Sequence, residues 1–146
     1  MKVNVKYLND DQHYKLYINN FNDIDNKDNI IYISCDNQLI TIEGIDKLPN
    51  LQYLNCNYNK LTSLKGIDKL PNLQYLCCRN NKLITLEGID KLPNLEYFDC
   101  YNNQLIYYWK KFGCYRKYIK QYKYKNMIYN LLNYNQVIEK IEILLI

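Results

Sequence analysis

The six cysteines have the widest choice of chemistry in this sequence, since thiols bind metals, pair as disulfides and act as nucleophiles. Cys56, Cys78 and Cys100 recur at intervals of 22 residues. A zinc site needs a tetrahedral set of ligands, usually with paired cysteines about two to four residues apart. Disulfides are typical of secreted proteins, yet the opening "MKVNVKYLNDDQ" lacks the apolar stretch of a secretory signal. We therefore predict that these three cysteines bind no metal. We expect them to be free thiols buried in the core.

Nucleophilic catalysis has few other residues to draw on. Cys77 lies one residue before a core cysteine, so we expect it on the opposite face of a strand, as an exposed thiol near Arg79. His13 is the only histidine, and Ser34 and Ser63 are the only serines. A nucleophile–base pair would have to use His13, and none of the four glycines lies in a phosphate-binding loop. The sequence thus predicts no catalytic residues, no cofactor and no enzyme activity.

These residues are positioned by an internal repeat of 22 residues, which starts at Leu51 and begins again at Leu73 and Leu95. Counting back one period reaches Asn29. Four positions recur in register, together with a glycine and the segment "KLPN". The recurring residues are Tyr32, Leu54, Leu76 and Phe98 at position 4; Ser34, Cys56, Cys78 and Cys100 at position 6; Asn37, Asn59, Asn81 and Asn103 at position 9; Leu39, Leu61, Leu83 and Leu105 at position 11; and Gly44, Gly66 and Gly88 at position 16.

This frame, L-x-x-L-x-C-x-x-N-x-L over about residues 29–109, resembles the leucine-rich repeat family in its short 22-residue class. The segments "IEGI" and "LEGI" resemble those of internalins and of phosphatase-regulating repeat proteins. The cysteine ladder, the Asn and Tyr content and the "LPNLQYL" junctions are also similar to leucine-rich repeat proteins of giant DNA viruses of amoebae. The resemblance implies an α/β solenoid of about four turns. It also implies a short parallel β-sheet on the concave face, and protein binding through that face.

Each repeat position also has a physical role of its own. Positions 4 and 6 are two residues apart, so both side chains point to one face of a strand. The resemblance implies that the Asn at position 9 hydrogen-bonds backbone groups of the turn and that stacked copies form a ladder, because buried backbone polar groups need such partners. Glycine at position 16 permits a positive φ, and proline at position 21 ends any helical turn before the next strand. One unit cannot bury its own apolar face, so about three or more must stack.

We predict one domain over residues 1–146, with repeats at 29–50, 51–72, 73–94 and 95–109. Residues 1–28 are predicted to form a β-type N-terminal cap, either a hairpin or short strands, because Val3, Val5 and Tyr7 alternate with polar residues. The first repeat, "IIYISC", fits two registers. One points Ile31, Ile33 and Cys35 inward, as the apolar character favours, and the other points Tyr32 and Ser34 inward, as Asn37 favours.

The fourth repeat stops after Tyr108, where two lysines replace the expected glycine and isoleucine. The apolar residues of 110–146 then follow a spacing closer to 3.6 than to 2, which predicts an α-helical C-terminal cap of two helices broken near 133–135. The final "KIEILLI" also alternates, so a terminal strand is a second interpretation. Either element would cover the apolar end of the last repeat.

Outward-facing strand positions form three rows that we predict to bind a partner protein or peptide. The second and third rows vary while the frame around them repeats, and Tyr and Arg are favoured interface anchors. The alternative is that the tyrosines merely pair between strands and fit a sheet surface. The rows are Tyr53, Tyr75 and Tyr97; Asn55, Cys77 and Asp99; and Asn57, Arg79 and Tyr101.

A basic segment at 110–125 offers a second binding surface. Its tyrosines interleave with cations, a pattern that suits phosphate contacts combined with base stacking. An acidic partner, an anionic membrane surface and a solvated outer face of the cap are the other interpretations. The basic residues are Lys110, Lys111, Arg116, Lys117, Lys120, Lys123 and Lys125.

The expected location follows from the same absence of targeting signals. No apolar run approaches the length of a transmembrane helix. We expect a cytoplasmic, reducing location, which would be the host cytoplasm if the chain is viral. The sequence does not indicate an oligomeric state.

Overall fold

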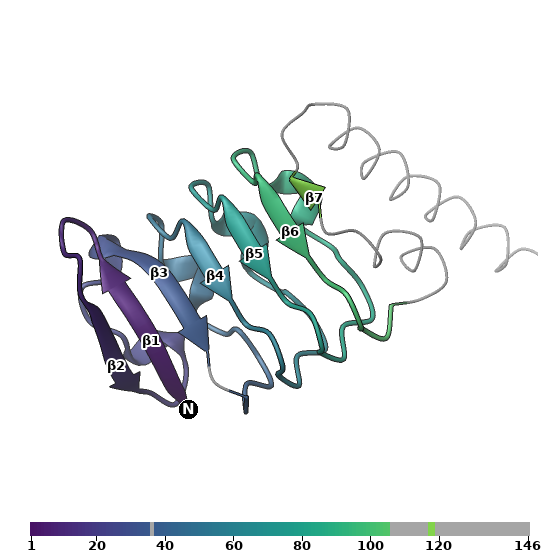
Figure 1. Cartoon of the computed structure of the whole chain (residues 1–146), viewed down its shortest axis with the longest axis horizontal. Coiled ribbons are helices and arrows are strands. Elements are labelled where there is room, and N and C mark those ends of the chain that lie inside the picture. The colour runs from purple at the N-terminus through teal and green to yellow at the C-terminus, as the bar shows by residue number, and fades with distance from the viewer. Residues whose placement is uncertain (36, 106–116, 119–146) are drawn as a thin grey trace, which may run out of the picture.

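A computed structural model describes residues 1–35, 37–105 and 117–118 of the chain, and these residues form one seven-stranded sheet. The strands lie in the order β2-β1-β3-β4-β5-β6-β7 (Figure 1). Short 3-10 turns, and no α-helix, accompany the sheet over these residues. The bounds are β1 Lys2–Tyr7, β2 His13–Tyr17, β3 Ile30–Cys35, β4 Tyr53–Asn55, β5 Tyr75–Cys77, β6 Tyr97–Asp99 and β7 Lys117–Tyr118, with η1 Phe21–Asp23, η2 Lys27–Asn29, η3 Ile45–Lys47, η4 Ile67–Lys69 and η5 Ile89–Lys91.

Strands β3 to β6 are parallel and supply the repeating part of the sheet. Leu54 lies beside Leu76, and Leu76 beside Phe98, so equivalent positions of successive repeats are neighbours. The predicted parallel sheet of short strands is therefore confirmed. Each turn of the solenoid contributes one row of side chains to the core and one to the opposite, concave face.

The opposite side of each turn is built by a glycine followed by a 3-10 helix. Gly44, Gly66 and Gly88 have φ of 86°, 94° and 92°, in the left-handed region where a Cβ is unfavourable. Each precedes a three-residue helix whose C-cap is a leucine followed by proline. The predicted positive φ is confirmed. Within the repeats, the helical part of the predicted α/β fold consists of 3-10 turns. About three residues lie between each glycine and the leucine that precedes proline, which is enough for a 3-10 turn but too few for an α-helix.

The core runs continuously under the sheet. Cys56 and Cys78 are fully buried and Cys100 is 1% exposed, among leucines and isoleucines of the adjacent turns. These thiols occupy the row predicted for them. The Cys56 thiol donates to the Cys77 carbonyl oxygen at 3.3 Å, so even its weak donor is satisfied inside the core.

The position-9 asparagines form the predicted ladder. Asn81 Oδ1 accepts from the Leu61 N–H at 3.0 Å, and its Nδ2 donates to the carbonyls of Cys56 and Cys78 at 2.9 and 3.0 Å. Asn59 accepts from the Leu39 N–H at 2.7 Å, and Asn103 from the Leu83 N–H at 2.9 Å. Each amide thus ties its own turn to a neighbouring one.

The asparagine of "KLPN" forms a second ladder, which the sequence reading did not anticipate. The amides of Asn72 and Asn94 donate to the carbonyls of Pro49 and Pro71 at 3.0 and 2.8 Å, each one turn away. Asn50 makes the equivalent bond to the Asp28 carbonyl at 2.8 Å. The Asp28 carbonyl lies within η2, and those of Pro49 and Pro71 come two residues after η3 and η4, so the ladder joins successive turns near their 3-10 helices.

The first repeat adopts the register with Ile33 and Cys35 inward. Ile31, predicted to point inward with them, is only half-buried, and Ile30 is buried instead, because the pairing of β3 with β1 shifts between Lys6 and Tyr7. Ile33 pairs with Leu54 and is fully buried, whereas Tyr32 pairs with Tyr53 and points to the concave face. Asn37, counted above as the first position-9 asparagine, is instead exposed. The physical reason is a turn shorter by one residue, since Leu39 follows Cys35 by four positions where Leu61 follows Cys56 by five.

The N-terminal cap is the predicted hairpin. β1 pairs antiparallel with β2 on one side and with β3 on the other, so it joins the repeats edge to edge. Val3 and Val5 are fully buried, as the alternation indicated. Phe21, in η1, adds a fully buried ring beneath the first turn.

The C-terminal segment lies outside the described residues except for Lys117 and Tyr118. These two residues form β7, antiparallel to β6, where the sequence predicted helix. A backbone pairing with the free edge of the last repeat strand accounts for the difference, because such an edge offers unpaired N–H and C=O groups. The helical cap over the rest of 110–146, and the other six basic residues of 110–125, fall outside the described residues.

Candidate functional site

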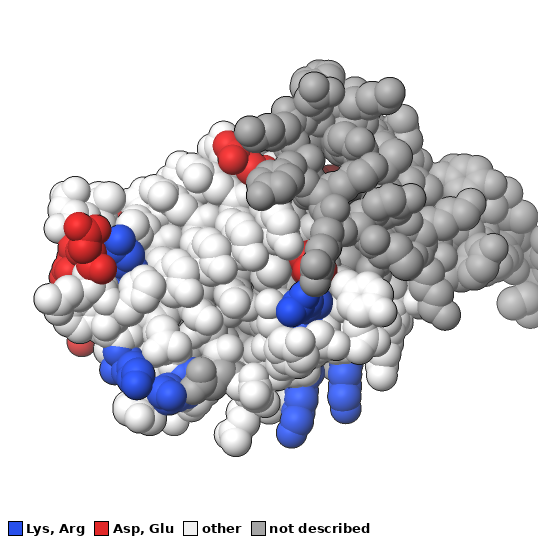
Figure 2. Space-filling model, viewed as in Figure 1, with Lys and Arg blue, Asp and Glu red and all other residues white. Residues whose placement is uncertain are grey.

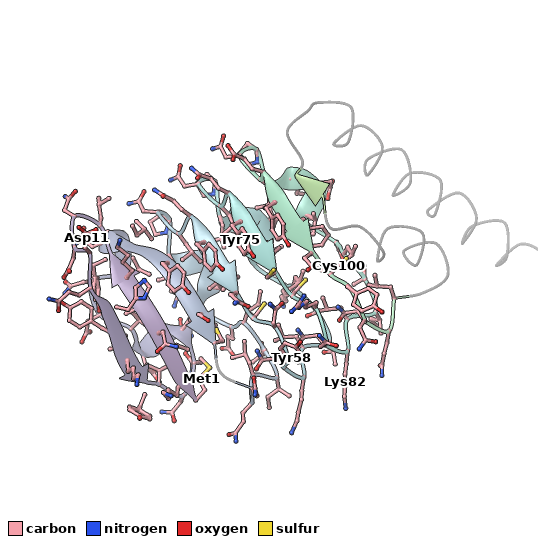
Figure 3. All side chains as sticks on the ribbon, in the orientation of Figure 1. Met1, Asp11, Tyr58, Tyr75, Lys82 and Cys100 are labelled. Atoms are coloured by element: carbon pink, nitrogen blue, oxygen red, sulfur yellow. The ribbon has the colours of Figure 1, made fainter. Side chains whose placement is uncertain are left out.

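A continuous stack of tyrosine rings crosses the concave face (Figure 3). The centroids of Tyr53 and Tyr75 are 4.1 Å apart, and those of Tyr75 and Tyr97 are 4.3 Å apart, with interplanar angles of 8° and 4°. Tyr32 extends the stack, 4.5 Å from Tyr53, and the His13 imidazole lies 4.8 Å from Tyr32. We call these five residues the aromatic row. The structure therefore brings together all three tyrosines predicted for the first row.

Tyr32 and His13 are members of the row that sequence reasoning missed. The 22-residue count favours an inward Tyr32, so the sequence left its face open and did not include it in the first row. The alternation of "IIYISC" carried the signal that it faces outward. His13 lies two strands away, on β2, and no repeat connects it with the tyrosines.

The geometry of the sheet explains the stack. Identical residues in register on parallel strands are about 4.8 Å apart, which suits parallel rings in contact. Because both faces of each inner ring stack against the neighbouring rings, the inner tyrosines can offer only their edges and hydroxyls to a partner. Burial raises the pKa of Tyr53, Tyr75 and Tyr97, and the Tyr75–Cys77 contact raises that of Tyr75 further. The hydroxyls are therefore neutral at physiological pH.

The second row is more enclosed than the sequence predicted. Cys77 is 4% exposed, and its sulfur lies 3.2 Å from the Tyr75 hydroxyl oxygen. The prediction of an exposed thiol at Cys77 is thus wrong, because the Tyr75 side chain lies against its sulfur. Asp99 is 1% exposed and accepts from the Tyr101 N–H at 3.1 Å. Asn55 accepts from the Asn57 N–H at 3.1 Å in the same local pattern.

The third row carries the charge of the face. An Arg79 nitrogen lies 3.9 Å from an Asp99 carboxylate oxygen, and the guanidinium carbon lies 5.7 Å from the centre of the Tyr58 ring. Asn57 Oδ1 accepts from the Arg79 N–H at 3.0 Å. Among the described residues, Arg79 Nε has no hydrogen-bond partner although it is buried. Tyr101 is 58% exposed.

The face is otherwise poor in charge. Figure 2 shows a broad uncharged area over β3 to β5, with lysines and acidic residues gathered at its margins.

Within the described part of the chain, no group of three or more His, Cys, Asp or Glu side chains could hold a metal ion. Burial raises the pKa of the Cys56 and Cys78 thiols well above the usual range. These two thiols are therefore protonated and poor nucleophiles at neutral pH.

Stability is expected to fall in alkali before the surface lysines titrate. Cys56 and Cys78 ionise in the unfolded chain near pH 8.5 but stay neutral in the folded one, so unfolding releases protons above that pH. The free energy of unfolding should be constant from pH 7 to 8, and about 2 kcal/mol lower at pH 9. Urea denaturation across this range measures it.

The control for this expectation is the Cys56→Ala, Cys78→Ala double variant. Its stability should stay level until about pH 10, where the tyrosines begin to ionise in the unfolded chain. A decline above pH 8 of the same size in the variant would contradict the assignment to these thiols.

The model for "Leucine Rich repeats (2 copies)" matches residues 28–69 and 71–107, which together make up more than half of the sequence. The chain belongs to the leucine-rich repeat family. Members of this family are generally non-enzymatic modules that typically bind other proteins. The match begins within η2 and ends beyond β6, so it includes the four parallel strands that carry the tyrosines of the aromatic row.

Among solved structures, an internalin from Listeria monocytogenes is similar, with 27% identity and a TM-score of 0.49. The similarity covers 51% of this chain and 22% of the internalin, so this leucine-rich repeat chain spans about a fifth of that protein. A search of curated proteins gave no match. The matches lend no support to the likeness to giant-virus proteins. None of the described helices is long and apolar enough to cross a membrane.

Proposed function

We propose that this chain is a non-enzymatic module that binds a partner protein or peptide through its concave face. The observation that carries the proposal is the aromatic row, an unbroken stack that extends from the cap across all four parallel strands. The binding residues we assign are the predicted rows, now with Tyr32 and His13. The contacts are Tyr53, Tyr75, Tyr97, Asn55, Asn57, Arg79 and Tyr101, and the buried Asp99 is a supporting residue.

The chemistry of the row favours a polypeptide over a nucleic acid. Bases bind aromatic residues by stacking on their faces, but the faces of the inner tyrosines are already used on each other. What remains exposed is a line of ring edges and neutral hydroxyls, which suits backbone amides and aliphatic side chains. Arg79 adds one cation beside this line, and its side chain is 28% exposed, so its guanidinium can donate to a carboxylate or carbonyl of the partner.

The size of the face limits the partner. Four strands span roughly 15 Å, which is small beside the roughly 800 Å² that each partner buries in a standard interface. We therefore expect recognition of a short segment, with the two enclosed residues Cys77 and Asp99 supporting the face from below. The buried Asp99 carboxylate holds the Tyr101 backbone and faces Arg79, so its contribution is to position these two residues.

The proposal is tested by selecting peptides from a random displayed library on the full chain and measuring their affinity for variants. The double variant Tyr53→Ser, Tyr75→Ser should bind the selected peptides at least about 30-fold more weakly, the loss typical of interface anchors. Tyr53→Phe, Tyr75→Phe keeps the stack and removes only the hydroxyls, so it should lose less. Tyr14→Ser, on the other face of the cap, is the control and should have no effect.

The rival surface is tested in the same experiment. A variant with all seven basic residues of 110–125 changed to glutamine should bind the selected peptides as the wild type does. If binding instead depends on these residues and falls steeply with salt, while the tyrosine variants bind normally, the concave face is not the site. We also propose a reducing, intracellular location, which the free thiols of Cys56, Cys77 and Cys78 support.

A further inference from the structure

The two edges of the sheet differ in how they are covered. β6 is followed by β7, so the edge of the last repeat strand is paired. β2 is the first strand in the order and pairs with β1 on one side only (Figure 1). Among the described residues, nothing pairs with its outer side. An open strand edge presents a row of backbone donors and acceptors, which is a template for another strand.

The hydrogen bonds of the hairpin show which groups point outward. The Met1 amino group donates to the Ile18 carbonyl at 2.6 Å, and the Ile18 N–H donates to the Met1 carbonyl at 2.9 Å. Because bonded and non-bonded pairs alternate in an antiparallel ladder, Leu16 and Tyr14 also bond toward β1. The N–H and C=O groups of the intervening residues, His13, Lys15 and Tyr17, therefore point away from the sheet.

The side chains along this edge are exposed and carry a positive charge at their centre. His13, Lys15 and Tyr17 are all exposed, and Tyr17 is 79% exposed. They share the concave face with their cross-strand neighbours Lys6, Asn4 and Lys2. The edge is therefore basic at Lys15 and at Lys2, beside Tyr17.

The acidic residues of the hairpin lie at its turn, away from Lys15. Asp11 bonds Lys6 at 3.1 Å, and Asp10 accepts from the Tyr14 hydroxyl at 2.7 Å. Figure 3 places Asp11 at the turn end of the hairpin, and Figure 2 shows basic groups at the other end. The charge gradient along the edge would orient an incoming strand with its carboxylates away from the turn.

A second copy of the chain is a poor occupant of this edge. Pairing two β2 strands antiparallel so that all three outward residues bond places Lys15 directly opposite Lys15, and like charges in that position are destabilising. An exposed lysine on a short edge strand is a known device against self-association. The same lysine attracts an extended segment that carries an acidic side chain opposite it.

We propose that the outer edge of β2 is a strand-addition site for an extended peptide with a carboxylate opposite Lys15. Backbone bonds to His13, Lys15 and Tyr17 supply the attachment, and the Lys15–carboxylate pair supplies the selectivity and register. This edge shares only His13 with the aromatic row, whose side chain stacks on Tyr32 while its backbone groups point outward from β2. The proposal rests on Lys15 and the open backbone, so it does not depend on the function proposed above.

Two synthetic nine-residue peptides of alternating valine and threonine, one with a central glutamate and one with a central lysine, test the proposal on the full chain. Binding is followed by fluorescence anisotropy, and the amide exchange of residues 13, 15 and 17 by NMR. The glutamate peptide should bind about fivefold more tightly than the lysine peptide. At saturation it should slow the exchange of these three amides.

Two substitutions of Lys15 distinguish the contribution of its charge from that of its backbone N–H. Lys15→Gln removes the charge alone and should abolish the preference between the peptides while retaining binding. Lys15→Pro also removes the outward N–H, a change that an edge strand tolerates, and should abolish binding of both. The exchange of Leu16, which bonds toward β1, checks that the hairpin persists in this variant.

Three results would overturn the proposal. One is binding of either peptide that Lys15→Pro does not weaken. Another is unchanged exchange of residues 13, 15 and 17 at peptide concentrations in the millimolar range. The third is concentration-dependent dimerisation of the wild type that Lys15→Pro abolishes, since the edge would then hold a second copy.

Discussion

Replacing Asn81 by alanine is expected to lower the free energy of unfolding by about 4 kcal/mol, a large part of the roughly 5–15 kcal/mol that stabilises an ordinary protein. The side chain is only 7% exposed and satisfies one N–H and two carbonyls that belong to two turns of the solenoid. Alanine leaves the Leu61 N–H buried without a partner, which costs about 1–3 kcal/mol. The carbonyls of Cys56 and Cys78 keep their bonds from Asn59 and Asn103, so each loses one of two hydrogen bonds, at about 1 kcal/mol apiece. Urea denaturation followed by circular dichroism measures the change.

The adjacent residue provides a matched control. Asn80 has φ of 55° and accepts a bond only from the exposed Asn102 side chain, at 2.7 Å. Asn80→Gly keeps the left-handed backbone available and should change stability by less than about 1 kcal/mol. Equal effects of the two substitutions would mean that the ladder contributes no more than a surface hydrogen bond does.

Much of this architecture could be predicted because the physical constraint and the sequence period coincide. A residue that must stack on its equivalent in the next turn recurs every 22 residues, as Cys56, Cys78 and Asn81 do. The first repeat departs from the count because its turn is one residue shorter, and only the apolar alternation of β3 records that change. The period alone would place Tyr32 inward and the alternation places it outward, so the two signals conflict and the sequence leaves both registers open.

The sequence could predict which residues lie on the candidate face, but not how exposed each of them is. Alternation shows which side of a strand Cys77 and Asp99 lie on, but not whether neighbours enclose them. Their burial depends on where Tyr75 and Arg79 place their side chains. Tyr75 lies against Cys77 of its own strand, and Arg79 faces Asp99 of the next repeat. The "KLPN" asparagines illustrate the reverse case. Their recurrence was visible, but a surface asparagine beside proline is also typical of a simple turn, so the repeat alone did not reveal a ladder.

Gly44→Ala is expected to lower the free energy of unfolding by about 3 kcal/mol, whereas Gly66→Ala should lower it by about 1 kcal/mol. Both glycines have similar left-handed backbones, with φ of 86° and 94°, so both substitutions carry the same conformational strain. They differ in the space that a methyl group would enter. A Cβ on Gly44 would lie 2.7 Å from the Asn22 backbone nitrogen, whereas the nearest atom to one on Gly66 is 3.5 Å away.

The position of Asn22 explains why the clash at Gly44 cannot be relieved cheaply. Its N–H is held by the Asn20 side chain at 2.8 Å, and the preceding residue, the fully buried Phe21, donates its own N–H to the Glu43 carbonyl at 3.2 Å. Moving Asn22 away therefore disturbs both the η1 cap and the packing of Phe21. Equal losses for the two alanine variants would show that backbone strain alone sets the cost. A larger loss confined to Gly44→Ala would show that the cap packs directly on the first glycine turn.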